Sequence, residues 1–170
     1  MEMHKVRLLK TVMVALLACG GVAAVAAHAD DMSEPTQAQA ELPREPLTIT
    51  SADKVAHVFS VEVARSRREQ EVGEMFRTTL ADDRGMLFVW PYAQQSDMWM
   101  KNTLVPLDIV SINADGTINA ITENAVPRSL AQIQSDGPVI ATLELAGGVT
   151  ARLGIRVGDK VTGKALPTHD

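Results

Sequence analysis

The chain has 170 residues, a formal net charge of −5 at pH 7 and a single cysteine, a combination that favours one acidic domain of ordinary size. Its negative charge and its lack of a basic run argue against nucleic acids and anionic membrane surfaces as partners. One cysteine cannot form a zinc finger or a redox pair. We therefore expect the hydrophobic core alone to hold the fold together, and we predict no cofactor.

Residues 1–29 have the three-part layout of a secretory signal peptide. Three basic residues lie within the first ten positions, an apolar stretch runs from Thr11 to Ala27, and Ala27-His28-Ala29 matches a cleavage site. A retained membrane anchor is the competing interpretation, but about 17 apolar residues interrupted by a glycine pair are short for a membrane span. We predict an exported protein, periplasmic or extracellular, with no stable membrane span after cleavage at Ala29.

A second processing route is also open. The segment Leu16-Leu17-Ala18-Cys19-Gly20 resembles a bacterial lipobox, in which Cys19 would carry a lipid anchor and become the mature N-terminus. The leucine before Ala18 fits that pattern less well than a smaller residue would, and the site at Ala29 competes with it. The lipoprotein is therefore the alternative, and both routes export the chain.

Residues 30–46 predict a disordered linker, because three prolines interrupt a polar stretch that has no apolar period. The folded domain is predicted over residues 47–163, with a flexible tail over 164–170. Within the domain, Ser66 followed by Glu69 is a capping-box pattern, which predicts a helix from Arg67 to about Met75. A turn of helix is expected near 150–153.

Short apolar or alternating runs predict the strands of the domain. They cover residues 47–51, 57–63, 86–90, 97–103, 107–113, 117–122 and 139–145, with two more about Gly158-Asp159. Ala114-Asp-Gly116 is a hairpin turn pattern. Strands that follow one another through turns favour a mainly β fold, a small antiparallel sandwich or barrel with one short α-helix after the second strand.

Several segments resemble the domain of unknown function family 192. They are Gly73-Glu-Met-Phe-Arg77, Gly85-Met-Leu-Phe88, Met98-Trp-Met-Lys-Asn-Thr103, Pro106-Leu-Asp108, Asp115-Gly116, Pro138-Val139 and Leu153-Gly154-Ile155. The resemblance runs from about Val58 to Val161 and implies a small β-rich fold, often exported, with no established activity. Glu74 and Ser111 depart from the family pattern, which commonly has apolar residues at both positions.

The segment from Asp97 to Asp108 combines large apolar side chains with several unlike polar groups. As a strand, it would place Met98, Met100 and Asn102 on one face, with the other face formed by Asp97, Trp99, Lys101 and Thr103. We predict the methionines in the core and a non-catalytic site for an unknown small ligand or peptide at Trp99, Lys101, Asn102, Thr103 and Asp108. The competing interpretation is that Trp99 closes a barrel end and Lys101 pairs with Asp108.

Three further hypotheses concern single residues or small sets. Arg77 would either anchor an anionic ligand or cap the C-terminus of the predicted helix. We predict no metal site, and the alternative is Cu(I) bound by Met98, Met100 and His57, since thioethers select Cu(I). A hydrolase-type enzyme using Asp108, with Lys101, Asn102 and Glu144 as further polar groups, is the other alternative, although no motif for a nucleophile is present.

Overall fold

The computed structural model describes residues 33–166. The predicted signal peptide, the Cys19 lipid site and the last residues of the tail lie outside that range. Within it, seven strands form one sheet in the order β5-β4-β6-β3-β2-β1-β7. The strands are β1 (Arg44–Thr50), β2 (Ala56–Ala64), β3 (Arg84–Met98), β4 (Leu107–Ile112), β5 (Ile118–Ala125), β6 (Ile133–Ala146) and β7 (Lys160–Gly163).

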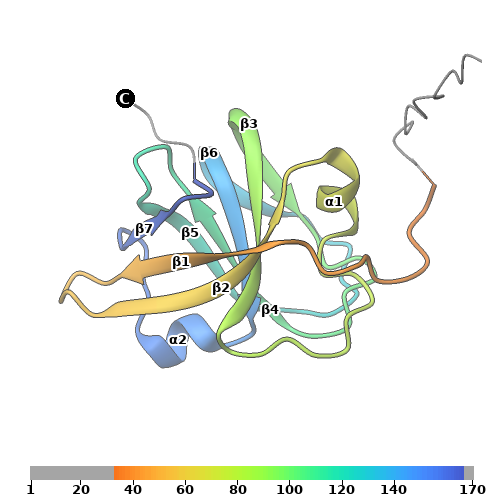
Figure 1. Cartoon of the computed structure of the whole chain (residues 1–170), viewed down its shortest axis with the longest axis horizontal. Coiled ribbons are helices and arrows are strands. Elements are labelled where there is room, and N and C mark those ends of the chain that lie inside the picture. Colours follow the sequence, from red (N-terminus) through yellow and green to blue (C-terminus); the bar gives the residue numbers. More distant parts are fainter. Residues whose placement is uncertain (1–32, 167–170) are drawn as a thin grey trace, which may run out of the picture.

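The sheet curls into a half-barrel, and its two edge strands meet at one end (Figure 1). There the Ile118 N–H donates to the Asp159 carbonyl, and the Val161 N–H donates to the Gly116 carbonyl. All strand pairs are antiparallel except β2 and β3, which are parallel. This parallel pair follows from α1 (Arg67–Val72), which carries the chain back across the sheet between those strands.

The prediction of a mainly β fold with a short helix after the second strand is confirmed. The Ser66 hydroxyl accepts from the Glu69 N–H and the Glu69 carboxylate accepts from the Ser66 N–H, so the capping box is present. The helix ends earlier than predicted, because Gly73 and Phe76 both adopt positive φ angles, 49° and 63°. A second short helix, α2 (Val149–Leu153), follows β6 on a different side of the molecule from α1 (Figure 1).

The main core fills the inside of the curl, and β3 is buried on both of its faces. Leu87 and Val89 join the main core, whereas Met86 and Phe88 join a second cluster with Ala64. This double burial explains the continuous apolar run in the sequence. We call the face that carries Met86 and Phe88 the outer face of the sheet.

The N-terminal arm, residues 33–43, lies inside the predicted linker and makes contacts with the domain (Figure 1). The Gln39 side-chain amide donates to the carbonyls of Glu69 and Gly73 at 3.1 and 3.0 Å. The Leu42 N–H donates to Glu62 Oε2 at 2.7 Å. Strand β1 then begins at Arg44, earlier than the predicted start of the domain.

The prediction of a strand over residues 97–103 is wrong. Strand β3 continues through Pro91 to Met98, with a register shift between Val89 and Gln94, where the proline has no N–H to offer the ladder. After Met98 the chain turns, and Asn102 has a φ of 56°, which is left-handed rather than extended. We call residues 99–103 the Trp99 turn.

Two other boundaries also differ from the sequence prediction. Strand β6 begins at Ile133, inside a stretch expected to be mostly turns, and one strand rather than two lies about Gly158-Asp159. The hairpin turn at Gly116 is confirmed, with a φ of 80°. In the part of the chain that the structure describes, no helix has the length and apolar character needed to cross a membrane.

Candidate functional site

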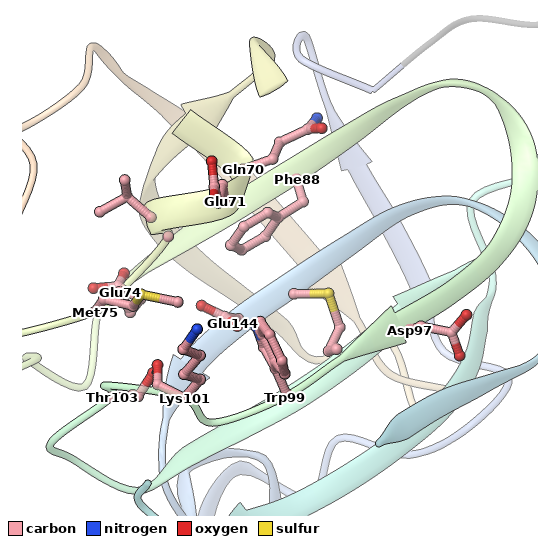
Figure 2. Close-up of a pocket in the computed structure, with 13 residues that line it drawn as sticks. Gln70, Glu71, Glu74, Met75, Phe88, Asp97, Trp99, Lys101, Thr103 and Glu144 are labelled. Carbon is pink, nitrogen blue, oxygen red and sulfur yellow. The ribbon is translucent and has the colours of Figure 1, made fainter. Parts of the chain in front are cut away.

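A hollow of about 240 Å³ opens on the outer face of the sheet, between α1 and the Trp99 turn (Figure 2). Its walls combine apolar side chains with carboxylates and one lysine. The lining residues are Gln70, Glu71, Val72, Gly73, Glu74, Met75, Phe88, Asp97, Met98, Trp99, Lys101, Thr103 and Glu144.

Strand register explains why an acid lies on the floor of this hollow. Glu62 of β2 is opposite Met86 of β3, which in turn is opposite Glu144 of β6. Residues opposite each other in a sheet share a face. The outer face therefore carries a row of Glu62, Met86 and Glu144, and the residues after α1 cover that row.

Glu74 follows α1 and lines the hollow together with Glu144 (Figure 2). Both residues are buried, at 2% and 4% exposure. Neither oxygen of Glu74 accepts a hydrogen bond, although Arg77 Nε lies 3.2 Å from its Oε2. Within residues 33–166 the Glu144 carboxylate has no hydrogen-bond or ion-pair partner.

Burial in this apolar setting changes the acidity of both groups. Desolvation raises the pKa of Glu74 from 4.5 to about 7, against the opposing charge of Arg77. Desolvation also raises the pKa of Glu144 well above 4.5, and the neighbouring charge of Glu74 adds to that rise. Both acids therefore ionise less readily than an exposed glutamate, and a positive charge placed in the hollow would favour their ionised forms.

Arg77 compensates Glu74 only in part, because the terminal N–H groups of its guanidinium bind Glu62. Its Nη1 and Nη2 donate to the two oxygens of Glu62 at 2.6 and 2.8 Å, which is a bidentate pair. Arg77 does not cap α1, which has no basic residue in its last turn. Arg77 is not among the residues that line the hollow.

Trp99 and Lys101 form the rim of the hollow. Trp99 is 46% exposed, and Lys101 Nζ lies 5.1 Å from its ring centroid, within the range of a cation–π contact. The same Nζ lies 2.6 Å from Glu34 Oε1 in the N-terminal arm. Lys101 therefore pairs with Glu34 and not with Asp108, as the competing interpretation had it.

Asn102 holds the Trp99 turn against the segment after α1, and the Thr103 N–H closes the turn by donating to the Met100 carbonyl. The Asn102 carbonyl accepts from the Phe76 N–H at 2.9 Å, and its side-chain amide donates to Met75 Sδ at 3.8 Å. Thr103 lines the hollow but is only 4% exposed. Both residues position the rim, and their predicted contact with a ligand stays a prediction.

Asp108 lies away from the hollow. It is opposite Leu145 of the main core, on the inner face, and is fully buried. Its carboxylate accepts from the N–H groups of Asn124, Gly148 and Thr150, and from the Thr150 hydroxyl, at 2.7 to 2.9 Å. It supplies the cap that Gly148 lacks at the start of α2.

A family model described as DUF192, uncharacterized ACR, matches residues 47–163 of the chain. The chain belongs to the DUF192 family. The match confirms the resemblance seen in the sequence, and no match was found among curated proteins.

Two crystal structures are similar to this DUF192 domain over most of its length. A protein from Sinorhizobium meliloti 1021, described as a predicted transcription regulator, is 41% identical, with a TM-score of 0.73, covering 75% of this chain and 99% of that one. A protein of unknown function from Novosphingobium aromaticivorans DSM 12444 is 40% identical, with a TM-score of 0.70, covering 77% and 94%.

The structure separates the three residues of the copper hypothesis for this DUF192 domain. Met100 is fully buried in a cluster with Leu107 and Ile109, Met98 lines the hollow, and His57 lines a different hollow beside Arg152. Within residues 33–166 there is no cluster of three or more His, Cys, Asp or Glu side chains able to hold a metal. The fold therefore does not bring Met98, Met100 and His57 together as ligands for Cu(I).

Sequence reasoning missed Glu74 as a site residue and considered Glu144 only beside Asp108. The one signal was Glu74 itself, a charged residue in the Gly-x-Met segment where an apolar residue is common in the DUF192 pattern. Its neighbour across the hollow, Glu144, lies far along the chain. Only strand register places that acid on the outer face.

Proposed function

We propose that this DUF192 domain is an exported, non-catalytic binding module that takes a small ligand, or one side chain of a peptide, into the hollow between α1 and the Trp99 turn. Export is supported by the signal-peptide pattern of residues 1–29. The binding role is supported by one observation above all. Glu74 and Glu144 are buried, line the hollow and lack hydrogen-bond partners among the described residues.

A hydrophobic core does not ordinarily keep such groups. Burying a polar group without a partner costs free energy, and almost all buried polar groups in proteins are hydrogen-bonded. Two such carboxylates in one hollow destabilise the fold unless a molecule from solution forms hydrogen bonds with them. A ligand that donates hydrogen bonds to them would recover that cost on binding.

The shape of the hollow narrows the size of the ligand. A volume of about 240 Å³ lies below the usual 300–1,000 Å³ of pockets that enclose drug-sized molecules. The occupant is therefore a small molecule or a single side chain. Trp99 at the rim adds a large, half-exposed ring that such a ligand would cover.

Two other functions receive less support. Hydrolysis at Asp108 is disfavoured because that carboxylate is fully buried and already accepts four hydrogen bonds. DNA binding is also disfavoured, because a net charge of −5 opposes phosphate contacts.

A ligand screen tests the proposal. Small molecules of mixed charge and short peptides would be screened by thermal shift against the full chain. Binders would then be retested with Val72→Phe, which enlarges a side chain in the wall of the hollow, and with Tyr92→Ala, which removes an exposed aromatic residue that does not line it. We expect binders that lose affinity with Val72→Phe and keep it with Tyr92→Ala. A screen without binders, or binders indifferent to Val72→Phe, would contradict the proposal.

A further inference from the structure

We propose that the hollow recognises a protonated amine, held between the carboxylates of Glu74 and Glu144 with its alkyl part against Phe88, Met98 and Trp99. The inference rests on the proposed binding function and names the chemical class of its ligand. The amine is either a free small molecule or the end of a lysine side chain.

When its acids are ionised, the hollow carries a negative excess, although Arg68 pairs with Glu71 and Arg77 lies beside Glu74. Four carboxylates line it, two buried ones at Glu74 and Glu144 and two more at Glu71 and Asp97. The one lining cation is Lys101, whose Nζ is engaged by Glu34 and lies over the Trp99 ring. An anionic ligand would add to this excess, whereas a cation would neutralise it.

Hydrogen bonding leads to the same ligand class. An ionised carboxylate only accepts, and an ammonium group has three N–H donors and no acceptor. Both Glu74 oxygens lack a hydrogen bond, because Arg77 spends its paired N–H groups on Glu62. One ammonium group has enough donors for both Glu74 and Glu144, whereas an alcohol has one; the Glu74 side chain is fully buried, so binding requires it to shift toward the hollow.

The walls favour an organic cation over a metal ion. Phe88, Met75 and Met98 supply ring and thioether surface, which suits an alkyl chain. Hard metal ions require several oxygen ligands, and the described residues offer no cluster of three or more acidic or histidine side chains. The Lys101 ammonium over the Trp99 ring shows that this rim tolerates positive charge, and the half-exposed ring offers apolar surface to the alkyl part of the ligand.

Proton linkage gives the proposal a second signature. An amine binds the ionised acids, so its affinity should increase as the pH rises through about 7, the pKa of Glu74. The charged groups that act on Glu74 are Arg77, Glu62 and Arg44, and those that act on Glu144 are Glu74 and Arg77. Binding near pH 7 should therefore release protons, in an amount that changes with buffer pH.

Matched probes test the charge requirement. Calorimetry with the full chain would compare n-butylammonium, 1-butanol and butyrate at pH 8 and at pH 5.5. We expect only the ammonium ion to bind, and more tightly at pH 8. Glu74→Gln and Glu144→Gln should each weaken it about 10- to 100-fold, the loss of one charge-assisted hydrogen bond. Asp82→Asn, the same chemical change at an exposed carboxylate outside the hollow, should leave affinity unchanged.

The other outcomes separate this inference from the proposed function. If butyrate or butanol binds as well as the ammonium ion, or if the glutamine variants keep full affinity, the amine inference is wrong while the binding function stands. Competition by K⁺ or Mg²⁺ at equal strength would also overturn it. A chain that binds neither butylammonium nor any compound of the wider screen would overturn both.

A final comparison identifies the source of the amine. Short peptides with an internal lysine, with acetyl-lysine, or with norleucine would be titrated beside butylammonium. Binding of the lysine peptide alone among the peptides, at higher affinity than butylammonium, indicates a protein partner. Higher affinity for the free amine indicates a small molecule.

Discussion

Two buried acids lie on opposite faces of the same strand pair, β4 and β6, and their surroundings differ completely. Asp108 faces the main core and accepts four hydrogen bonds. Glu144, on the outer face opposite Ile109, has no hydrogen-bond partner among residues 33–166 and has the acid Glu74 as its neighbour. Burial alone therefore does not distinguish an acid that stabilises the fold from one that is available to a ligand. The number of hydrogen-bond partners distinguishes them.

The largest expected effect is on the inner face. Asp108→Ala would leave three backbone N–H groups and the Thr150 hydroxyl without their acceptor, so we expect the free energy of unfolding to fall by about 4 kcal/mol. Urea unfolding at pH 7 measures this. Thr150→Val, which removes one of the four donors, should lose much less. An Asp108→Ala chain of normal stability would contradict the structural role.

The next effect concerns the ion pairs beneath the hollow. Arg77→Met would leave Glu62 without its bidentate partner and Glu74 without its nearest cation, and we expect a loss of about 3 kcal/mol. The loss is smaller than at Asp108 because Glu62 keeps Arg44 at 3.7 Å and the Leu42 N–H.

A double variant checks this account. Replacing Glu62 by Gln together with Arg77→Met removes both charges, so it should be more stable than Arg77→Met alone. Additive losses from the two single changes would mean that the pair does not act as a unit.

The strands that face the main core and the start of α1 could be predicted from the sequence. Alternating residues in β1 and β2 place most of their apolar side chains on one face, and Ser66 with Glu69 marks the start of α1, so periodicity and capping were enough. The family pattern supported the same fold. These features depend on residues close together in the chain.

The hollow could not be predicted in the same way. Its acids come from the segment after α1 and from β6, and they meet only because β2, β3 and β6 align side by side. Strand alternation correctly predicted a buried Met100 and an exposed Trp99. The segment is nevertheless a turn with a left-handed Asn102, so strand geometry is not what places these side chains. Asp108 looked like a site residue because a lone acid in a short segment gives no sign of its distant N–H donors.

The third prediction uses the raised pKa of Glu74 to test the outer face. Since its pKa is about 7 in the folded chain and 4.5 is its ordinary value, this group favours folding fully below pH 4.5 and loses that contribution as the pH rises through 7. A rise of the Glu74 pKa from 4.5 to about 7 corresponds to about 3 kcal/mol. Burying the Gln amide without a partner offsets part of this gain, so Glu74→Gln should stabilise the chain at pH 8 by about 2 kcal/mol.

Chemical denaturation from pH 4.5 to pH 8 measures that difference. The wild type should lose stability over this range more steeply than Glu74→Gln, and the two should approach each other toward pH 4.5, below which Glu74 becomes protonated in both states. The matched change Asp82→Asn, at an exposed acid, should follow the wild type. A Glu74→Gln chain less stable than the wild type at pH 8 would mean that Glu74 is compensated in the folded state.

The smallest expected effect on stability is at the rim, where Trp99→Ala should change the free energy of unfolding by less than about 1 kcal/mol, because the ring is 46% exposed. The same variant should lose butylammonium affinity, since it removes the ring face that covers the ligand. Trp90→Ala is the matched control: Trp90 is half-buried, lies 6.2 Å from the Phe88 ring and does not line the hollow. It should therefore lose more stability and less affinity than Trp99→Ala. If Trp99→Ala destabilises the chain as much as Asp108→Ala is expected to, Trp99 has a structural role like that of Asp108. The hollow would then lose its most accessible recognition surface.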